Sequence, residues 1–272
     1  MFIWNVSPIA FSILGIQVYW YGVIYAASLL SSWWMATWSL RKVRNIFPVS
    51  VPSADTFDKF MFFSIIWMII GARLGHVLFF DFEYYLKNPM EIFMLRQGGL
   101  AFHGSVMALG IYTYSFCRSH HFEWRALTDV LCFAGSLGLG IGRLANFVNQ
   151  ELYGRICSAD FAVIFSLVDH MPRYPTQLFE SVFEGLLNFW VLLIIFRLKG
   201  VRTIGSGVLT SIFCIIYSSA RFVIEFYKEV PIERYFGWLS LTVGQTLSIA
   251  LFLFGIFVIN CQKKRSKVQS DD

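Results

Sequence analysis

Long, nearly uninterrupted apolar stretches dominate this sequence of 272 residues. Hydrophobic residues make up 57% of the chain and charged residues only 14%, whereas a soluble domain carries about 25% charged residues. Mean hydropathy is +0.60. A run of about 20 apolar residues is long enough to cross a bilayer as a helix. The sequence therefore predicts an all-α, polytopic integral membrane protein surrounded mainly by lipid.

Seven such runs predict seven transmembrane helices, at 17–38, 57–80, 99–117, 126–148, 178–198, 205–227 and 238–260. The connections are short except for 149–177, which contains two prolines and is expected to form a small extramembrane element. Because no repeat or soluble segment interrupts the chain, we expect 1–272 to form a single transmembrane domain.

The basic residues predict the orientation. The 22 Lys and Arg residues divide 13 to 6 between the two sets of connections, and three lie inside spans, at Arg73, Arg143 and Arg221. By the positive-inside rule, the N-terminus lies outside and the C-terminus lies in the cytoplasm. The basic residues occur in short clusters between apolar runs, so they indicate topology rather than nucleic-acid binding.

With this orientation, the polar residues of the spans gather near the outer surface, with Asp129 as the exception. Each charge inside a bilayer costs at least about 2.5–3.5 kcal/mol on insertion scales, so the group predicts a functional site. Its members are Tyr21, Arg73, His103, Arg143, Asn146, Asn149, Glu151, Gln177, Glu180, Glu184, Tyr217, Arg221, Glu225 and Gln245.

Structural explanations exist for single members of this group. Arg73 fits a snorkelling side chain or a structural partner of Glu180, and His103 fits an ordinary interior histidine. An intrahelical ion pair with an interfacial tyrosine would account for Tyr217, Arg221 and Glu225, which share one helix face. Taken together, however, three arginines with few acidic partners predict an excess of positive charge. Guanidinium groups bind phosphate well, so the ligand is expected to be an anion.

Other features exclude some classes of site. Five dispersed cysteines form no CxxC pair and the histidines are scattered, so no metal site is expected. Glycines surround His103 at 98–104 and precede Arg143 at 138–142. Small residues at these places allow either close helix packing or the approach of a ligand.

The string Gly142–Arg155, GRLANFVNQELYGR, resembles the signature of the bacterial prolipoprotein diacylglyceryl transferase family. Tyr174, Phe179 and Lys228 depart from the usual family pattern. Further matching segments extend along almost the whole chain, at Trp20–Gly22, Gly71–Gly75, Gly98–Gly104, Pro175–Glu180, Tyr217, Arg221–Phe226 and Leu241–Gln245.

The resemblance implies a multi-pass enzyme of the bacterial inner (cytoplasmic) membrane, with its active site toward the periplasmic leaflet. Such an enzyme transfers the diacylglyceryl group of phosphatidylglycerol to the lipobox cysteine thiol of a preprolipoprotein. A thioether forms and glycerol phosphate is released. The implied partners are phosphatidylglycerol, the preprolipoprotein and membrane lipids, with no nucleic acid, cofactor or metal.

The reaction assigns roles to the polar residues. The catalytic candidates are His103, Arg143, Arg221 and Tyr217, and the candidates for binding phosphatidylglycerol are Arg143, Tyr21, Asn146, Asn149, Glu151, Gly154, Arg73 and Glu225. Glu151 and Glu225 are expected to hold the arginine side chains in place. His103 is the candidate base because a neutral imidazole exists near pH 7. Alternatively, the arginines lower the pKa of the substrate thiol, water takes the proton, and His103 only forms hydrogen bonds.

Two further classes fit the sequence less well. A transporter for an anionic phosphorylated solute usually places its site near the midplane, between inverted repeats. Here the charges lie toward one face and no repeat is visible. An intramembrane protease using Ser105 beside His103 is disfavoured because helix positions two apart do not face each other.

Overall fold

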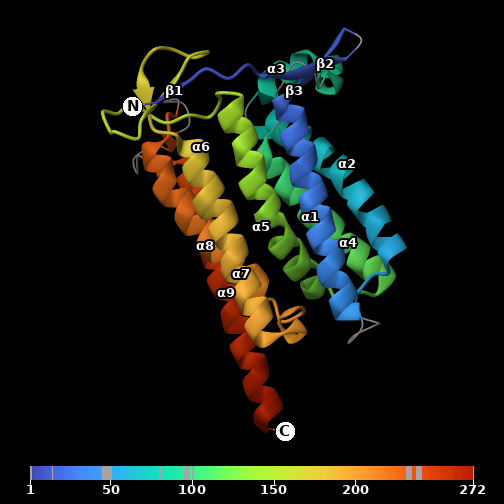
Figure 1. The fold of residues 1–272 in the computed structure, drawn as a ribbon. Coiled ribbons are helices and arrows are strands. Elements are labelled where there is room, and N and C mark those ends of the chain that lie inside the picture. Colours follow the sequence, from blue (N-terminus) through green and yellow to red (C-terminus); the bar gives the residue numbers. More distant parts are fainter. Residues whose placement is uncertain are drawn as a thin grey trace. The chain divides into compact units, whose positions relative to one another are not determined.

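The computed structural model describes residues 2–13, 15–44, 51–79, 81–94, 99, 101–230, 235–236 and 241–271, and only the backbone for 79, 102–103, 235–236 and 262–271. The described chain is mainly helical (Figure 1). Its long helices are α1 (Trp20–Arg44), α2 (Ala54–Phe79), α4 (Phe102–His120), α5 (Trp124–Val148), α7 (Leu187–Lys199), α8 (Val208–Ile224) and α9 (Val243–Asp271). Shorter helices are α3 (Phe82–Lys87), η1 (Pro89–Phe93), α6 (Thr176–Phe179), the π-helix η3 (Glu180–Leu186), η4 (Val201–Thr203) and η5 (Glu225–Tyr227). The strands are β1 (Phe2–Trp4), β2 (Ile9–Ile13), β3 (Ile16–Tyr19), β4 (Val163–Phe165), β5 (Pro172–Arg173), β6 (Tyr235–Phe236) and β7 (Leu241–Thr242).

Five helical stretches of the described chain are long and apolar enough to cross a membrane. They correspond to five of the seven predicted spans, so the prediction of a mainly helical, multi-pass protein is confirmed. The predicted spans 17–38 and 99–117 also form helices, α1 and α4, but neither belongs to this set. The five stretches are Ala54–Leu78, Trp124–Val148, Thr176–Lys199, Val208–Tyr227 and Val243–Cys261.

The first predicted helix begins later than expected, because residues 17–19 belong to a β-hairpin. Strands β2 and β3 pair in antiparallel fashion. Gly15 has a φ of +80° in the turn between them, a conformation that glycine adopts without strain. β-Branched residues, which favour extended structure, occur throughout both strands. The chain then enters α1 at Trp20, directly after the last residue of β3.

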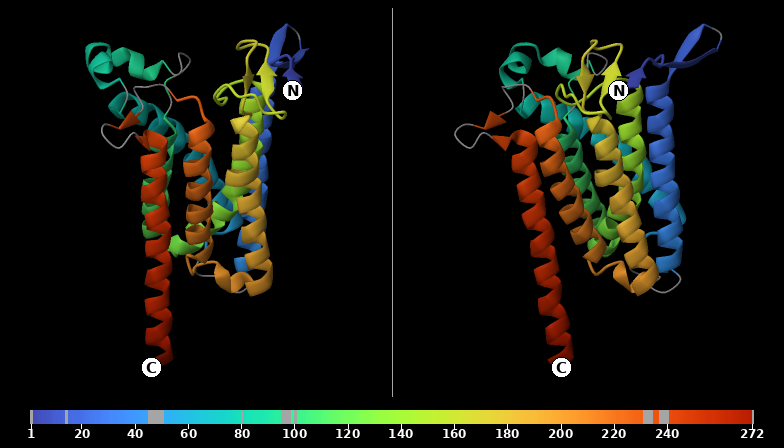
Figure 2. Two further views of the ribbon diagram at one scale, coloured as in Figure 1. Left: turned by 90° about the vertical axis from the view of Figure 1, so that its left-hand side faces the viewer. Right: turned by 60° about the vertical axis from the view of Figure 1, so that its left-hand side comes forward.

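The described chain forms two compact units, Met1–Trp38 with Asp129–Asp272 (unit 1) and Ser39–Thr128 (unit 2). In unit 1, α8 packs against α7, α9 and the π-helix η3. Figure 2 shows α8 between α7 and α9, and shows that α9 continues beyond the end of α8. This unit holds the buried charges described in the next subsection.

Asp129, the exception in the predicted charge distribution, anchors the start of α8. Its carboxylate is fully buried and accepts four hydrogen bonds. Oδ2 accepts from the backbone N–H groups of Gly205 and Gly207 at 3.0 and 2.8 Å. Oδ1 accepts from the N–H and hydroxyl of Thr210 at 2.8 and 2.7 Å. These donors surround the N-terminus of α8, where backbone N–H groups lack partners within the helix and a negative charge is stabilised.

In unit 2, α2 and α4 pack closely through glycines. A Cβ added to Gly75 would lie 2.7 Å from Cα of Gly104, and one added to Gly104 would lie 2.8 Å from Cα of Gly75. The hydroxyl of Ser105 donates to the carbonyl of Met68 at 2.8 Å, which ties the same two helices together. Small residues at such crossings allow backbones to approach one another in a bilayer, so this helix contact depends on glycine.

Replacing Gly104 with alanine is expected to lower the free energy of unfolding by about 1–3 kcal/mol, since α2 and α4 must move apart. Gly110 on the same helix is the matched control, because a Cβ there meets nothing within 4 Å. Gly110→Ala is expected to raise stability by up to about 1 kcal/mol, because alanine favours the helix. Thermal unfolding of both variants in one detergent measures the difference. Equal melting temperatures would contradict the role of glycine at this crossing.

The connection 149–177 contains two short strands, β4 and β5. They form a three-stranded sheet with β1, which lies near the N-terminus of the chain. Strand β4 pairs in parallel with β1 and in antiparallel fashion with β5. Val163 and Phe165 of β4 form a buried apolar cluster with Phe147 at the end of α5. The ring of Trp4 from β1 lies 4.6 Å from that of Phe147. The end of α5 is therefore fixed by a small core of its own.

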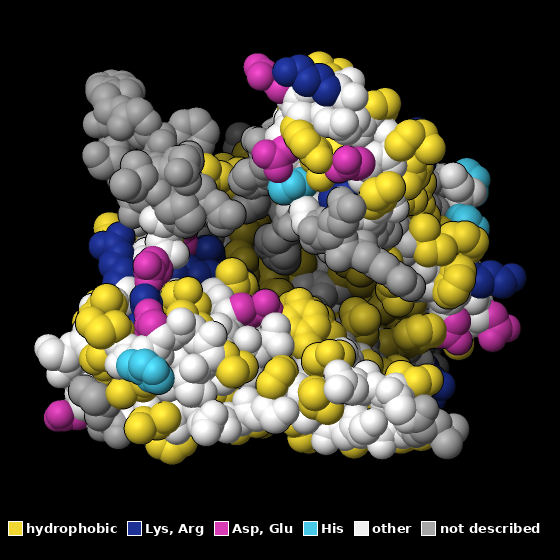
Figure 3. Space-filling view, turned by 90° about the horizontal axis from the view of Figure 1, so that it is seen from above, with side chains coloured by type: hydrophobic (Ala, Val, Ile, Leu, Met, Phe, Trp, Pro, Cys, Tyr) yellow, Lys and Arg dark blue, Asp and Glu magenta, His cyan; other side chains and the backbone are white. Residues whose placement is uncertain are grey.

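Arg173 holds this element to the segment that follows α8. Its guanidinium pairs with Asp169 at 2.6 Å and with Glu229, and donates to the carbonyl of Gly154 at 3.2 Å. The guanidinium also lies 4.6 Å from the centre of the Tyr153 ring. Hydrogen bonds from Arg173 keep the pKa of the Asp169 carboxyl below its usual range. Figure 3 views this end of the molecule and shows basic and acidic side chains side by side at its left edge.

Candidate active site

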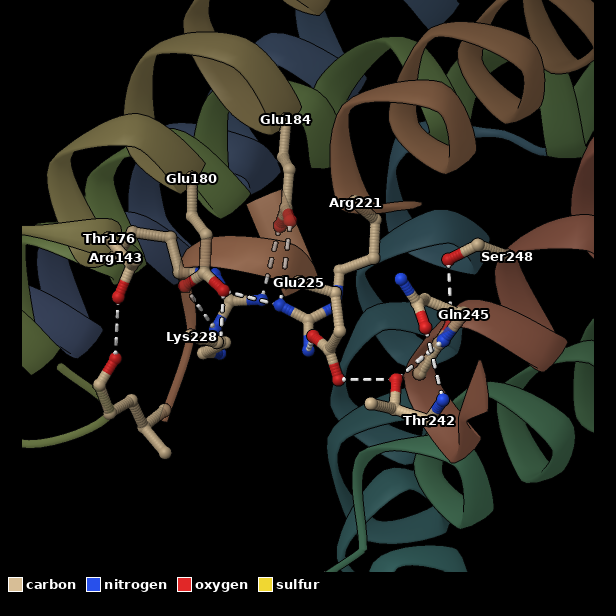
Figure 4. Close-up of polar contacts among 12 residues, drawn as sticks. Arg143, Thr176, Glu180, Glu184, Arg221, Glu225, Lys228, Thr242, Gln245 and Ser248 are labelled. Atoms are coloured by element: carbon tan, nitrogen blue, oxygen red, sulfur yellow. Dashed lines mark hydrogen bonds and ion pairs between the residues drawn. The ribbon is translucent and has the colours of Figure 1, made fainter. Parts of the chain in front are cut away.

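Arg143, on α5, lies at the centre of a cluster of buried charges in unit 1. Its Nη1 is 3.3 Å from Oε2 of Glu180, and its Nη2 is 3.2 Å from Oε2 of Glu184 (Figure 4). Both glutamates are fully buried. Among the described residues, these contacts use one hydrogen on each Nη of Arg143, and a guanidinium has five N–H donors. Arg143 therefore retains donors for a ligand.

Arg221, on α8, shares the same glutamates. It pairs with Glu180 and with Glu225, whose Oε2 lies 2.7 Å from Nη2, and its Nη1 is 3.7 Å from Oε1 of Glu184. Glu225 in turn accepts a hydrogen bond from the hydroxyl of Thr242 at 2.9 Å. This confirms the expected i, i+4 pair of Arg221 and Glu225. It also links the cluster to the start of α9.

A π-helix carries the two shared glutamates. The segment η3 begins at Glu180 and includes Glu184, and it leads directly into α7 at Leu187. Single π-turns inside helices occur frequently at functional sites. Here the widened turn places both carboxylates on Arg143 at nearly equal distances.

Lys228 is a third cation, and the sequence gave it no role in the site. Its Nζ lies 2.6 Å from Oε1 of Glu180, the same oxygen that Arg221 contacts. Lys228 is 7% exposed although it comes directly after the apolar span Val208–Tyr227. A lysine just after a hydrophobic run resembles an ordinary topology signal, so nothing in its position along the chain marks it as buried. The available signal was that the family it resembles often has arginine at this position, so that Lys228 changes the residue but keeps the charge.

The cluster is balanced in formal charge. Its cations are Arg143, Arg221 and Lys228, and its carboxylates are Glu180, Glu184 and Glu225. The excess of positive charge expected from the sequence is therefore not found among the described residues. The expectation failed because charges near one another in depth do not reveal their pairing. Burial explains the balance, since a buried charge without a partner is strongly unfavourable.

The end of α5 and the following turn form a second polar group. Glu151 accepts hydrogen bonds from Nδ2 of Asn146 at 2.6 Å and of Asn149 at 3.3 Å. Nε2 of Gln177 donates to the Glu151 carbonyl at 2.7 Å. Glu151 thus orients two amides, whereas the sequence suggested that it would hold an arginine. Oδ1 of Asn146 is buried without a hydrogen-bond partner among the described residues.

Two tyrosines predicted for the site lie in unit 1. Tyr217 is 8% exposed and lies close enough to Arg143 and Arg221 to interact with their charges. The ring of Tyr21, on α1, lies 4.5 Å from that of Tyr25, and its hydroxyl interacts electrostatically with Arg143 and Glu151. The structure therefore brings both within electrostatic range of the charged cluster.

Gly154 lies where three segments meet. Its N–H donates to the carbonyl of Tyr174 at 2.9 Å, and it forms an antiparallel bridge with Lys228. A Cβ at this position would lie 2.6 Å from Cβ of Tyr174 and 2.6 Å from the carbonyl oxygen of Tyr227. Close approach of backbone, rather than an unusual φ, requires glycine here.

Two predicted residues belong to unit 2. Arg73 is buried and donates to the carbonyls of Glu91, Ile92, Met94 and Gly99 at 2.5–3.4 Å. These contacts with backbone carbonyls give Arg73 a structural role that the sequence did not specify. The backbone of His103 lies in the first turn of α4, and its side chain lies outside the described residues.

The part of the chain that the structure describes has no evident metal-binding site. No group of three His, Cys, Asp or Glu side chains there is arranged to hold a metal ion. The carboxylates of the cluster are instead neutralised by arginine and lysine.

Comparison with known proteins assigns the chain to a family. Residues 8–261 match the family model described as prolipoprotein diacylglyceryl transferase. A phosphatidylglycerol–prolipoprotein diacylglyceryl transferase of Rickettsia felis is 38% identical over 259 residues, which cover 95% of this chain and 97% of the relative. That of Rickettsia typhi is 38% identical over 256 residues (94% and 96%), and that of Rickettsia bellii strain OSU 85-389 is 36% identical over 256 residues (94% and 95%). The resemblance that the Gly142–Arg155 string indicated thus extends over nearly the whole sequence, and the chain belongs to the prolipoprotein diacylglyceryl transferase family.

Proposed function

We propose that this protein transfers the diacylglyceryl group of phosphatidylglycerol to the lipobox cysteine of a preprolipoprotein, the first step of bacterial lipoprotein maturation. The observation that carries the proposal is the buried pair Arg143 and Arg221, which shares two glutamates in a chain of this family. Guanidinium donors inside a membrane protein suit the phosphate of an anionic lipid.

The reaction is a displacement at carbon. The cysteine sulfur forms a bond to the terminal glyceryl carbon, the bond from that carbon to the phosphate oxygen breaks, and glycerol phosphate leaves with the electron pair. Negative charge therefore grows on the phosphate. Donors already in place stabilise it without reorganisation, and Arg143 and Arg221 supply these donors through guanidinium hydrogens that the glutamates leave free.

The neutral residues around the arginines suit the glycerol headgroup. Oδ1 of Asn146 is a buried acceptor without a partner among the described residues, so a headgroup hydroxyl satisfies it. Glu151 fixes the orientation of Asn146 and Asn149. Tyr21 and Tyr217 add hydroxyls that interact electrostatically with Arg143. We assign these residues to headgroup binding.

The substrate thiol must lose its proton, because the thiolate is the nucleophile. We assign this step to His103. If the assignment holds, His103→Gln loses most activity near pH 7 and regains part of it at higher pH, where more of the thiol ionises without a base. The pH dependence of the transfer rate in both proteins measures this. A variant with full activity and an unchanged pH profile would remove the general-base role.

The proposed setting is the bacterial inner membrane, with seven spans, the N-terminus in the periplasm and the C-terminus in the cytoplasm. The division of basic residues, 13 to 6, supports this orientation. It places the Arg143 cluster toward the periplasmic leaflet, where a translocated lipobox cysteine arrives. Labelling of cysteines introduced at Lys87 and Lys199, from each side of the membrane, tests it.

The decisive assay uses the purified protein in vesicles with radiolabelled phosphatidylglycerol and a synthetic lipobox peptide. We expect a thioether-linked diacylglyceryl peptide and stoichiometric glycerol phosphate. A peptide with serine in place of the cysteine is the control. Uptake of an anionic solute without a thioether product would favour a transporter, a reading that the similarity to transferases along the chain does not support.

A further inference from the structure

Lys228 shares its binding partner with an arginine of the proposed phosphate site. Both Lys228 and Arg221 contact Oε1 of Glu180, and Arg143 contacts Oε2 of the same carboxylate. Figure 4 shows the three cations converging on Glu180 from different elements. An ammonium group has three donors, so a single contact with Glu180 leaves Lys228 with capacity to bind a second anion beside the arginines.

The backbone of Lys228 is held by the Gly142–Arg155 string. Arg155 donates its N–H to the carbonyl of Tyr227 and its Nε–H to the carbonyl of Lys228, both at 2.9 Å. Gly154 forms the antiparallel bridge with Lys228. A Cβ on Gly154 would meet the Tyr227 carbonyl oxygen at 2.6 Å. Any larger residue at position 154 must therefore push residues 227–228 away.

We propose that Lys228 is a third cation that binds the lipid phosphate, and that Gly154 is the positioning residue that sets the place of Lys228. The proposal rests on the function proposed above and deepens it. It assigns a role to a residue that the sequence analysis did not place in the site, and it explains physically why position 154 requires glycine.

Charge balance supports the assignment. With Lys228, the cluster has three cations and three carboxylates, so an anionic headgroup meets a neutral site with free donors. Without Lys228, the same site carries one net negative charge in a buried environment, where it repels phosphate strongly. Lys228 thus contributes both a donor and the charge that permits an anion to enter.

Lys228→Met tests the first part, because methionine keeps much of the length and removes the charge. Loss of a charge-assisted hydrogen bond is expected to raise the KM for phosphatidylglycerol at least about tenfold, and Lys228→Arg is expected to restore it to near the original value. Lys87→Met, at an exposed position in α3, is the control and keeps its KM. An unchanged KM in Lys228→Met, or an arginine variant as poor as the methionine variant, would overturn the assignment.

Gly154→Ala tests the second part through a double-mutant cycle. Gly154→Ala is expected to raise the KM for phosphatidylglycerol, and adding Lys228→Met should cause little further loss, because the displaced lysine no longer contributes. Fully multiplicative effects of the two changes would show that Gly154 acts independently of Lys228, and would refute the positioning role.

A binding measurement separates this proposal from the proposed function. Retention of fluorescent phosphatidylglycerol by each purified variant, with phosphatidylcholine as the uncharged comparison, requires no turnover. If the unchanged protein forms no thioether product, the proposed function fails. If it forms the product but Lys228→Met binds phosphatidylglycerol as selectively as the unchanged protein does, only the role of Lys228 fails. Thermal unfolding identifies a misfolded variant, and Lys228→Gln then replaces Lys228→Met in both measurements.

Discussion

Arg143→Ala is expected to lower the rate of diacylglyceryl transfer by at least about 10³-fold, the cost of removing a preorganised donor that stabilises developing negative charge. Arg143 pairs with Glu180 and Glu184, and its remaining donors are the ones we assign to the phosphate. Its loss also leaves Glu184 with the longer contact to Arg221 at 3.7 Å. The site then carries an extra negative charge where the phosphate must bind.

Initial rates with labelled phosphatidylglycerol and the lipobox peptide measure the effect of Arg143→Ala. Arg143→Lys separates charge from shape, because lysine keeps the charge but cannot contact two carboxylates as a planar fork does. It should recover only a small part of the rate. Arg118→Ala, at an exposed position near the end of α4, should be fully active. Normal transfer by a folded Arg143→Ala protein would refute the phosphate site.

Asp129→Ala is expected to destabilise the protein by about 3–5 kcal/mol while leaving the activity of the folded molecules nearly unchanged. The carboxylate accepts four hydrogen bonds at the start of α8. After the substitution, three backbone N–H groups and one hydroxyl remain buried without their acceptor. Asp129→Asn should destabilise the protein less than Asp129→Ala, because the amide oxygen still accepts hydrogen bonds. It should not be neutral, because the NH₂ group of asparagine faces other donors.

Thermal unfolding in detergent measures this loss, with a decrease in Tm on the order of 10 °C expected for Asp129→Ala. Asp55→Asn, an exposed aspartate in the first turn of α2, is the control and should shift Tm only slightly. If Asp129→Ala melts at the temperature of the unchanged protein, the carboxylate does not anchor α8.

The sequence predicts the helices well where apolar runs are long and uniform, as in 126–148 and 205–227, because burial in lipid and helix formation then demand the same residues. It fails at 17–19, where alternating residues after Gly15 form a hairpin strand. It also leaves the number of spans open at α1 and α4, whose polar residues dilute the apolar signal.

For the site, the sequence identifies Arg143 and Arg221 because a charge within an apolar run is conspicuous. It does not identify their partners. Glu151 orients Asn146 and Asn149 instead of an arginine, and Lys228 joins the cluster from beyond a span. Which carboxylate meets which cation depends on how helices rotate and pack, and periodicity within one helix carries no information about its neighbour.

The π-helix at Glu180–Leu186 has a consequence for how this chain tolerates changes in length. A π-turn closes hydrogen bonds from i to i+5 and so behaves like an α-helix with one residue inserted. Deleting a single residue there, even the exposed Val182, would restore α-helical spacing and rotate everything on its N-terminal side by about 100° relative to α7. Glu180 would then turn away from all three cations. In this stretch the number of residues is as strictly constrained as their identity, although the side chains that face lipid remain free to vary.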